Sequence, residues 1–117
     1  MIHTDGSVYE IVDDLIEIGV DILNPCQPYA KDMEPEKLKS KFGQRLVFHG
    51  GIDQQKILRK EGIQKVQEEI KKKIQGFAPG GGYILAPAHT IEDDTPVENV
   101  IAMFNFAREF GKYPLRI

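Results

Sequence analysis

Three histidines stand at positions from which they could share a chemical site. Each of His3, His49 and His89 follows a short apolar run that is typical of a buried strand. In a parallel α/β sheet or barrel, the carboxyl ends of all strands open on one face, where catalytic and binding residues collect. Histidine is a common metal ligand, although it also fills structural roles. The three positions therefore predict a shared site at the carboxyl ends of the strands.

Polar residues after two of the predicted strands are candidates for substrate binding. Asn24 and Gln27 follow one strand and could hydrogen-bond a ligand or satisfy backbone groups of the loop. His49 could line the pocket, although a role in packing or bracing the loop is favoured. Asp53 is expected to be a cap or turn residue, with substrate contact as the alternative. Cys26 is expected to be a small buried apolar side chain rather than a ligand or nucleophile.

Helical and strand patterns alternate along the whole chain, and the fold class they predict is α/β with parallel strands. Helices are predicted at 7–18, 34–42, 63–75 and 96–110, and short buried strands at 20–23, 45–48 and 83–86, with residues 49–53 as a loop. Ser7 with Glu10 forms a possible capping box, and Gly19 a left-handed end for the same helix. Thr95 and Pro96 are expected at the N-cap and first position of the last helix.

Length and strand number predict part of a larger barrel. The 117 residues allow one domain, about half of a usual (β/α)8 barrel. The first strand has only Met1 and Ile2 before His3, whereas strands usually have about five residues. We therefore expect the tail of a longer protein. Its unpaired sheet edges favour pairing with a missing N-terminal half or with a second copy, as in a homodimer.

Composition excludes several classes of partner. The net charge is −3, which does not favour nucleic acid. The basic run Lys71–Lys73 follows Glu68 and Glu69, and we interpret it as a solvated helix face with Glu-to-Lys pairs. No apolar run approaches the ~20 residues of a membrane helix. The single cysteine and the lack of a signal-peptide pattern predict a cytoplasmic protein without an internal disulfide.

Five ordered segments resemble one family over nearly the whole chain. They are His3-Thr4-Asp5-Gly6-Ser7, Ile18 to Pro25, Phe48 to Asp53, Gly80 to Pro87 and Asp94 to Asn99. Together they resemble the C-terminal half of the uroporphyrinogen decarboxylase superfamily. That superfamily also contains zinc-dependent methyltransferases, which move methyl groups from corrinoid proteins to thiols. The resemblance implies a (β/α)8 barrel, of which residues 1–117 form a single partial domain from the end of strand five through helix eight.

The methyltransferase branch of the superfamily implies a metal site. That branch holds zinc with a His-x-Cys pair after strand five and a cysteine after strand eight. Here the matching positions are His3, Asp5 and His89, so the first histidine is kept and both thiolates are replaced. His, Asp and His still form a set of three ligands with an open position, which suits zinc or another divalent metal. The resemblance also implies a corrinoid protein as methyl donor and a small thiol as substrate.

The decarboxylase branch implies a different reaction, which needs no metal. It places a histidine that positions a porphyrinogen at the end of its last strand, and His89 is the match. Its essential aspartate and arginines belong to the N-terminal half, so this chain would supply only part of the site. His3 and His89 are thus the candidate catalytic residues, and a non-catalytic, self-associating half-barrel is the third alternative.

Overall fold

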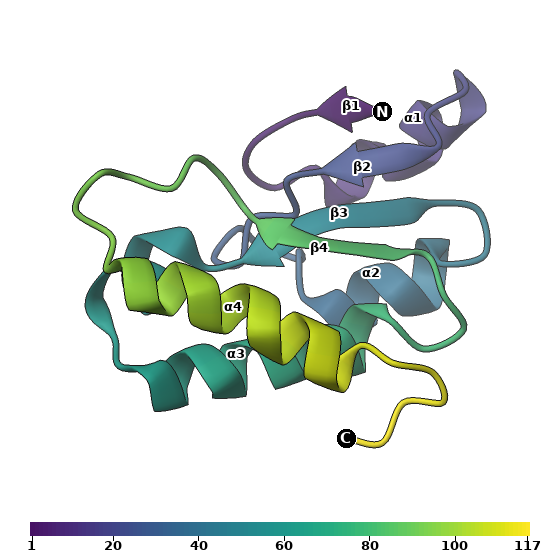
Figure 1. Cartoon of the computed structure of the whole chain (residues 1–117). Helices are drawn as coiled ribbons and strands as arrows, with labels where there is room; N and C mark the ends of the chain where they lie inside the picture. The colour runs from purple at the N-terminus through teal and green to yellow at the C-terminus, as the bar shows by residue number, and fades with distance from the viewer.

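The computed structural model describes all residues, 1–117, as one parallel four-stranded sheet with helices between its strands (Figure 1). The strands are β1 (Ile2–His3), β2 (Ile22–Asn24), β3 (Val47–Ile52) and β4 (Tyr83–Pro87). The α-helices are α1 (Val12–Glu17), α2 (Pro35–Phe42), α3 (Ile63–Phe77) and α4 (Val97–Phe110), with the 3₁₀ turn η1 (Tyr9–Ile11) and the π-helical segment η2 (Gln54–Leu58).

The strands lie side by side in chain order, and every neighbouring pair is parallel. Right-handed crossovers between consecutive strands of such a sheet place the connecting helices on one face. Figure 1 shows α2, α3 and α4 together along one side of the sheet. This is the arrangement of half a (β/α)8 barrel, in which the other face of the sheet lines the interior, and the predicted fold class is confirmed.

The apolar core lies between the sheet and its helices and has two parts. The first joins Leu23 of β2 and Phe48 of β3 to Leu38 and Phe42 of α2 and to Phe77 of α3. The second joins β3 to helices α3 and α4; its members include Ile52, Val66, Ile70, Ile74, Ala102 and Met103. Because successive side chains of a strand point to opposite faces, residues next to Leu23 and Phe48 face away from the helices.

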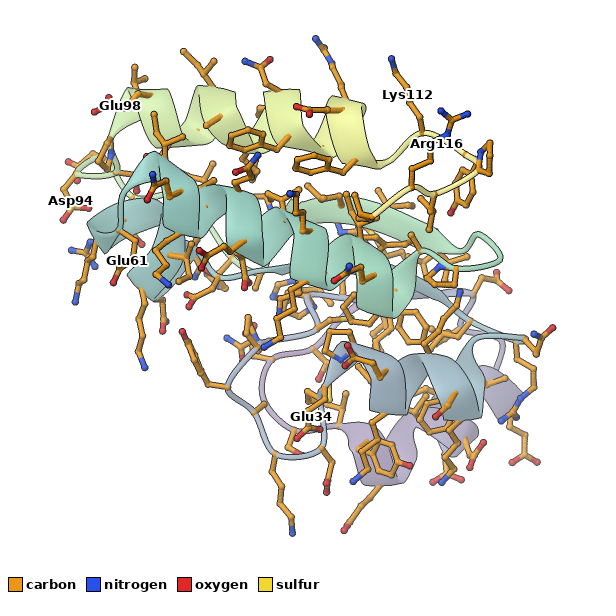
Figure 2. All side chains as sticks on the ribbon, turned by 90° about the horizontal axis from the view of Figure 1, so that it is seen from below. Glu34, Glu61, Asp94, Glu98, Lys112 and Arg116 are labelled. Atoms are coloured by element: carbon orange, nitrogen blue, oxygen red, sulfur yellow. The ribbon has the colours of Figure 1, made fainter.

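Charges at the two ends of α4 match the helix dipole. Asp94 and Glu98 lie near its N-terminal end, whereas Lys112 and Arg116 lie beyond its C-terminal end (Figure 2). Negative charge is stabilising at the first end and positive charge at the second. The predicted Thr95 cap is wrong, because Pro96 occupies the N-cap and the buried Thr95 hydroxyl has no hydrogen-bond partner.

The first predicted helix is shorter than its apolar pattern suggested. The predicted helix over 7–18 is a 3₁₀ turn from Tyr9 followed by α1 from Val12. The Ser7 hydroxyl donates to the carbonyl of Lys31, so it is engaged by a distant loop and no side-chain cap forms. Gly19 has a φ of +100°, as predicted for the end of this helix.

The predicted loop over 49–53 is mostly strand. β3 continues through Ile52 because β4 pairs with it from Phe48 to Ile52. His49 therefore lies within a strand rather than after one. Gly50 has a φ of +114°, and a Cβ there would lie 2.3 Å from the carbonyl oxygen of Pro25, so only glycine fits.

The basic run on α3 is only partly solvated. Lys73 is buried, and its ammonium lies 3.6 Å from the carboxylate of Glu69, one helical turn earlier. The expected pairing of glutamate with lysine is present, but the expected exposure of Lys73 is wrong. The position of Lys73 on the helix turns it toward the sheet, along with Ile70 and Ile74.

None of the helices is both long and apolar enough to cross a membrane.

Candidate metal centre

Three polar residues form one row across the sheet, at the carboxyl ends of β1 and β2 and within β3. His3 pairs with Asn24 in the sheet, and His49 follows Phe48, which pairs with Leu23. His3 Nδ1 lies 2.5 Å from Asn24 Oδ1, and Asn24 Nδ2 lies 2.6 Å from His49 Nδ1. The row lies on the face of the sheet that points away from the helices.

The other side of the His3 ring faces two further potential metal ligands, Asp5 and His89. His3 Nε2 lies 3.4 Å from a carboxylate oxygen of Asp5. The ring of His89, in the loop after β4, is 6.0 Å from the ring of His3, at an interplanar angle of 68°. One potential ligand atom from each of the three residues lies within 4.8 Å of the other two. The structure thus brings together the three residues predicted as metal ligands, from opposite edges of the sheet.

The donor set fits a divalent metal. In a tetrahedral site with metal–ligand bonds of about 2.0–2.2 Å, ligand atoms are about 3.3–3.6 Å apart. The His3–Asp5 distance of 3.4 Å matches this value, and a ligand atom of His89 lies within 4.8 Å of both. All three residues are exposed, which leaves a coordination position open toward solvent. Two imidazoles and one carboxylate are harder ligands than thiolates, and they suit zinc, iron or manganese.

Two polar cavities adjoin this cluster. The larger, of about 600 Å³, has no apolar residue in its wall; it is lined by Asp5, Gln27, Gln54, Gln55, Lys56, Arg59, Lys60, His89 and Glu92. The smaller, of about 170 Å³, is lined by His3, Asn24, Pro87, Ala88, His89 and Thr90. His89 lines both cavities, so a small polar molecule in either one would contact the cluster.

The residues predicted to bind substrate mainly hold the protein's own groups. Gln27 accepts a hydrogen bond of 2.5 Å from the backbone N–H of Gly6, which braces the loop after β1. Asp53 caps η2 by accepting from the N–H of Lys56, as expected of a cap residue, and also accepts from the Tyr29 hydroxyl. Burial and this contact with Asp53 raise the pKa of Tyr29. Of these residues, Gln27 also lines the larger cavity.

Cys26 lies close to this row but is sequestered. The side chain is 2% exposed, and burial raises the pKa of its thiol to about 12. Thiolate is the form that binds metals and attacks electrophiles. The expectation of a buried apolar cysteine therefore agrees with its environment.

The π-helical segment η2 was not predicted, although it forms one wall of the larger cavity. It carries Gln54, Gln55 and Lys56 directly after β3 and Asp53, a position at which binding residues are common in this fold. Glu69 of α3 accepts a hydrogen bond of 3.2 Å from the Asp53 N–H and pairs with the buried Lys73. This buried pair anchors the start of η2 to the helix layer.

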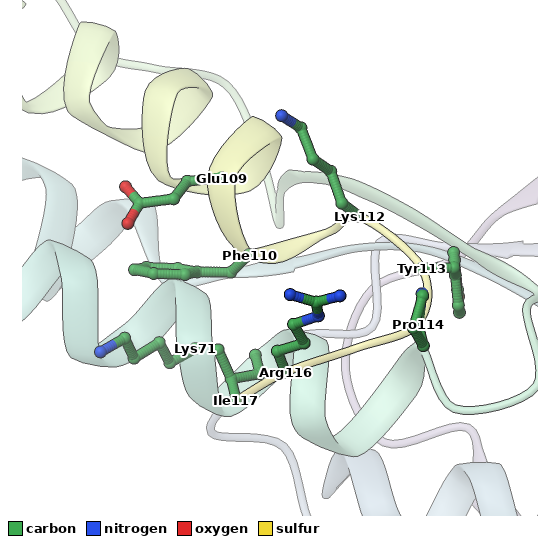
Figure 3. A pocket seen from close by; sticks show the side chains of 8 residues that line it. All are labelled: Lys71, Glu109, Phe110, Lys112, Tyr113, Pro114, Arg116 and Ile117. Carbon is green, nitrogen blue, oxygen red and sulfur yellow. The ribbon is translucent and has the colours of Figure 1, made fainter.

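A further cavity, of about 520 Å³, lies at the opposite end of α4 from the loop that carries His89 (Figure 3). It is lined by Phe110 and the C-terminal residues, with the Lys71 ammonium 4.7 Å from the centre of the Phe110 ring. None of the predicted site residues lines it.

The fold and the cluster define an α/β barrel protein with its candidate site at the carboxyl ends of parallel strands. The sequence profile of the family described as "Uroporphyrinogen decarboxylase (URO-D)" matches residues 1–110. The chain belongs to this family. A comparison with curated proteins found no match.

The fold was also compared with solved structures. The fold is similar to that of a methyltransferase from Methanosarcina mazei, with a TM-score of 0.76 and 28% sequence identity. The alignment covers 94% of this chain and 31% of the methyltransferase. The chain therefore spans about a third of the length of that protein.

Proposed function

We propose that this chain is the C-terminal part of a metal-dependent methyltransferase of the uroporphyrinogen decarboxylase family. In this proposal the complete enzyme moves a methyl group from a corrinoid protein to a small thiol substrate. The observation that carries the proposal is the convergence of His3, Asp5 and His89 at the carboxyl ends of β1 and β4. The similarity to a methyltransferase supports the same branch of the family.

The three residues would hold a divalent metal, with zinc as the first candidate. Bound there, the ion would supply Lewis acidity that favours the deprotonated, nucleophilic form of a thiol. His3 would bind through Nε2, because its Nδ1 is engaged by Asn24. Asp5 would contribute negative charge next to His3, which lowers the net positive charge of the site.

The surrounding polar residues would orient the substrate. The larger cavity is lined by Asp5 and His89, and also by three cationic side chains from residues 56–60. A small polar substrate would be held there close to the ligand cluster. The corrinoid protein would approach the carboxyl ends of the strands, where the ligand cluster is exposed.

The remainder of the barrel is part of the proposal. The unpaired edges of β1 and β4 would be completed by an N-terminal half or by a second copy of the chain. Either partner would close the barrel and shield the cluster from bulk water.

Uroporphyrinogen decarboxylation is the second candidate, favoured by the description of the matching family. In that case His89 would position the porphyrinogen and no metal would be required. The arginines that recognise the acidic substrate would come from the other half of the barrel.

Metal analysis separates the two candidates. Protein purified without chelator or a histidine tag is expected to contain about one zinc per chain, and His3→Ala and His89→Ala are each expected to lose it. Asp93→Asn is the matched control, because Asp93 is exposed and lies outside the cluster. Zinc content that is unchanged in both histidine variants would contradict the methyltransferase proposal.

A further inference from the structure

Asn24 connects two histidines through a single side-chain amide. Its Oδ1 lies 2.5 Å from His3 Nδ1, and its Nδ2 lies 2.6 Å from His49 Nδ1 and 3.2 Å from the backbone carbonyl oxygen of His49. The residue is only 9% exposed. All the principal hydrogen-bonding groups of the amide are therefore directed at protein atoms.

The backbone carbonyl of His49 determines which way the amide faces. A carbonyl oxygen can only accept a hydrogen bond, so the amide atom next to it must be the nitrogen. The oxygen of the amide then faces His3. The reverse orientation would place two carbonyl oxygens against each other in a buried position, which is unfavourable.

This orientation selects a different tautomer for each histidine. Because Asn24 Oδ1 can only accept, His3 Nδ1 must carry a hydrogen, and in the neutral ring Nε2 then has the free lone pair. Because Asn24 Nδ2 can only donate, His49 Nδ1 must accept, and the hydrogen of the neutral ring is on Nε2. One amide thus makes His3 Nε2 an acceptor and His49 Nε2 a donor.

We propose that Asn24 is a positioning residue that sets the tautomers of His3 and His49, so that His3 presents its Nε2 lone pair toward Asp5 and His89. His3 Nε2 is the atom that lies 3.4 Å from Asp5. A metal ligand must present a lone pair, and the hydrogen bond made by the other ring nitrogen selects it. The metal-binding part of this inference rests on the proposed function, whereas the tautomers do not.

The inference also explains why an asparagine occupies this position. An aspartate would accept from His3 equally well, but its ionised carboxylate has no hydrogen to donate to the carbonyl or to Nδ1 of His49. A leucine would leave both imidazoles without their partner. An amide accepts through its oxygen and donates two hydrogens through its nitrogen, which matches the three contacts made here.

Nuclear magnetic resonance tests the tautomers directly in the metal-free chain. In protein labelled with ¹⁵N-histidine, long-range ¹H–¹⁵N correlation spectra distinguish protonated from unprotonated ring nitrogens. Spectra are recorded at about pH 8.5, at which imidazole free in solution is neutral. The three histidines are assigned with His49→Gln and His89→Gln. We expect hydrogen on Nδ1 of His3 and on Nε2 of His49, and hydrogen on Nε2 of His3 would overturn the inference.

Substitution of Asn24 tests its positioning role. In Asn24→Leu, both rings are expected to lose their single tautomer, and zinc affinity is expected to fall about 10- to 100-fold, as for other outer-shell partners of ligating histidines. Asn105→Leu, at an exposed position of α4, is the matched control and is expected to change neither. Unchanged tautomers or unchanged zinc affinity in folded Asn24→Leu would overturn the positioning role.

The two measurements fail independently. A wild-type chain with the expected tautomers but without zinc binding would support the hydrogen-bond inference and reject the proposed metal site. A wild-type chain that binds zinc through His3 but has the opposite tautomer before zinc is added would support the site and overturn the role of Asn24.

Discussion

The two edges of the sheet differ greatly in how firmly they are held. β4 pairs with β3 from Phe48 to Ile52, and both strands pack on α3 and α4. β1 pairs with β2 only at Ile2 and His3, and its neighbourhood is more exposed. The candidate ligands are divided between these edges, with His3 and Asp5 on the weak one and His89 on the strong one. A bound metal would therefore link the weakly held edge to the firmly held one.

The largest expected effect is on the firmly held side. Phe48→Ala removes a fully buried ring that lies 5.1 Å from Phe77, centre to centre, and is expected to lower the free energy of unfolding by about 3–5 kcal/mol. Urea denaturation measures this change. Phe104→Ala, on the exposed face of α4, is expected to cost about 0.5 kcal/mol or less, and equal losses in both variants would contradict the core assignment.

The next effect tests the buried ion pair that anchors η2. Lys73→Met leaves the carboxylate of Glu69 without its partner, and a loss of about 3 kcal/mol is expected. The double variant Lys73→Met/Glu69→Gln is expected to recover much of this loss, because no unpaired buried charge remains and the neutral amide still accepts from the Asp53 N–H. Urea denaturation of the two variants gives the comparison, and a double variant no better than the single one would show that the pair does not act as a unit.

Zinc is expected to strengthen the weak edge. At a zinc concentration about 100 times its Kd, the free energy of unfolding is expected to rise by about 2.7 kcal/mol, because the ion binds only the folded chain. Hydrogen exchange at the amides of residues 2–5 should slow in parallel. His3→Ala is expected to show neither change, and stabilisation that persists in this variant would place the metal elsewhere.

The last expected effect concerns the pH dependence of stability that Cys26 causes, and it is absent at neutral pH. Burial raises its pKa from 9.0 to about 12 in the folded chain, so the unfolded chain loses this proton first. The protonated thiol of Cys26 makes its full contribution to the free energy of unfolding below pH 9.0. This contribution decreases between pH 9.0 and about 12, with a slope of up to about 1.4 kcal/mol per pH unit. Comparison with Cys26→Ala in denaturation experiments over this range isolates the thiol, and parallel pH profiles would contradict its burial.

Local sequence patterns predicted where the helices lie better than they predicted how helices and strands begin and end. The apolar spacing of α3 and the proline at the start of α2 located both helices within two residues. The glycines of β3 indicated a loop, because positive φ values are typical of turns, yet pairing with β4 held them in a strand. Likewise, Ser7 was expected to cap a helix, but the carbonyl of Lys31 engages its hydroxyl. Contacts between distant segments overrode the local preference in both cases.

For the candidate site, the sequence indicated which residues take part, and the fold showed which side chains contact one another. Parallel strands bring their carboxyl ends to one face, which predicted a shared site for the histidines, and the resemblance to the methyltransferase branch implied His3, Asp5 and His89 as its ligands. The amide of Asn24 looked like a substrate contact, since nothing in its neighbours along the chain indicated two imidazole partners. Those partners are 21 and 25 residues away and meet it only through the register of the sheet.

The sequence by itself determined the ordered segments that resemble the family and the alternation of strands and helices, and the resemblance then implied the three potential ligands. The segments and the alternation depend on residue type and short-range spacing, which a single chain displays directly. Only the tertiary structure decided that Lys73 is buried, that η2 forms a wall of the polar cavity, and that Asn24 orients two histidines. Each of these depends on the side chains that another segment presents at the same point in space, and that information arises only when the sheet and its helices pack together.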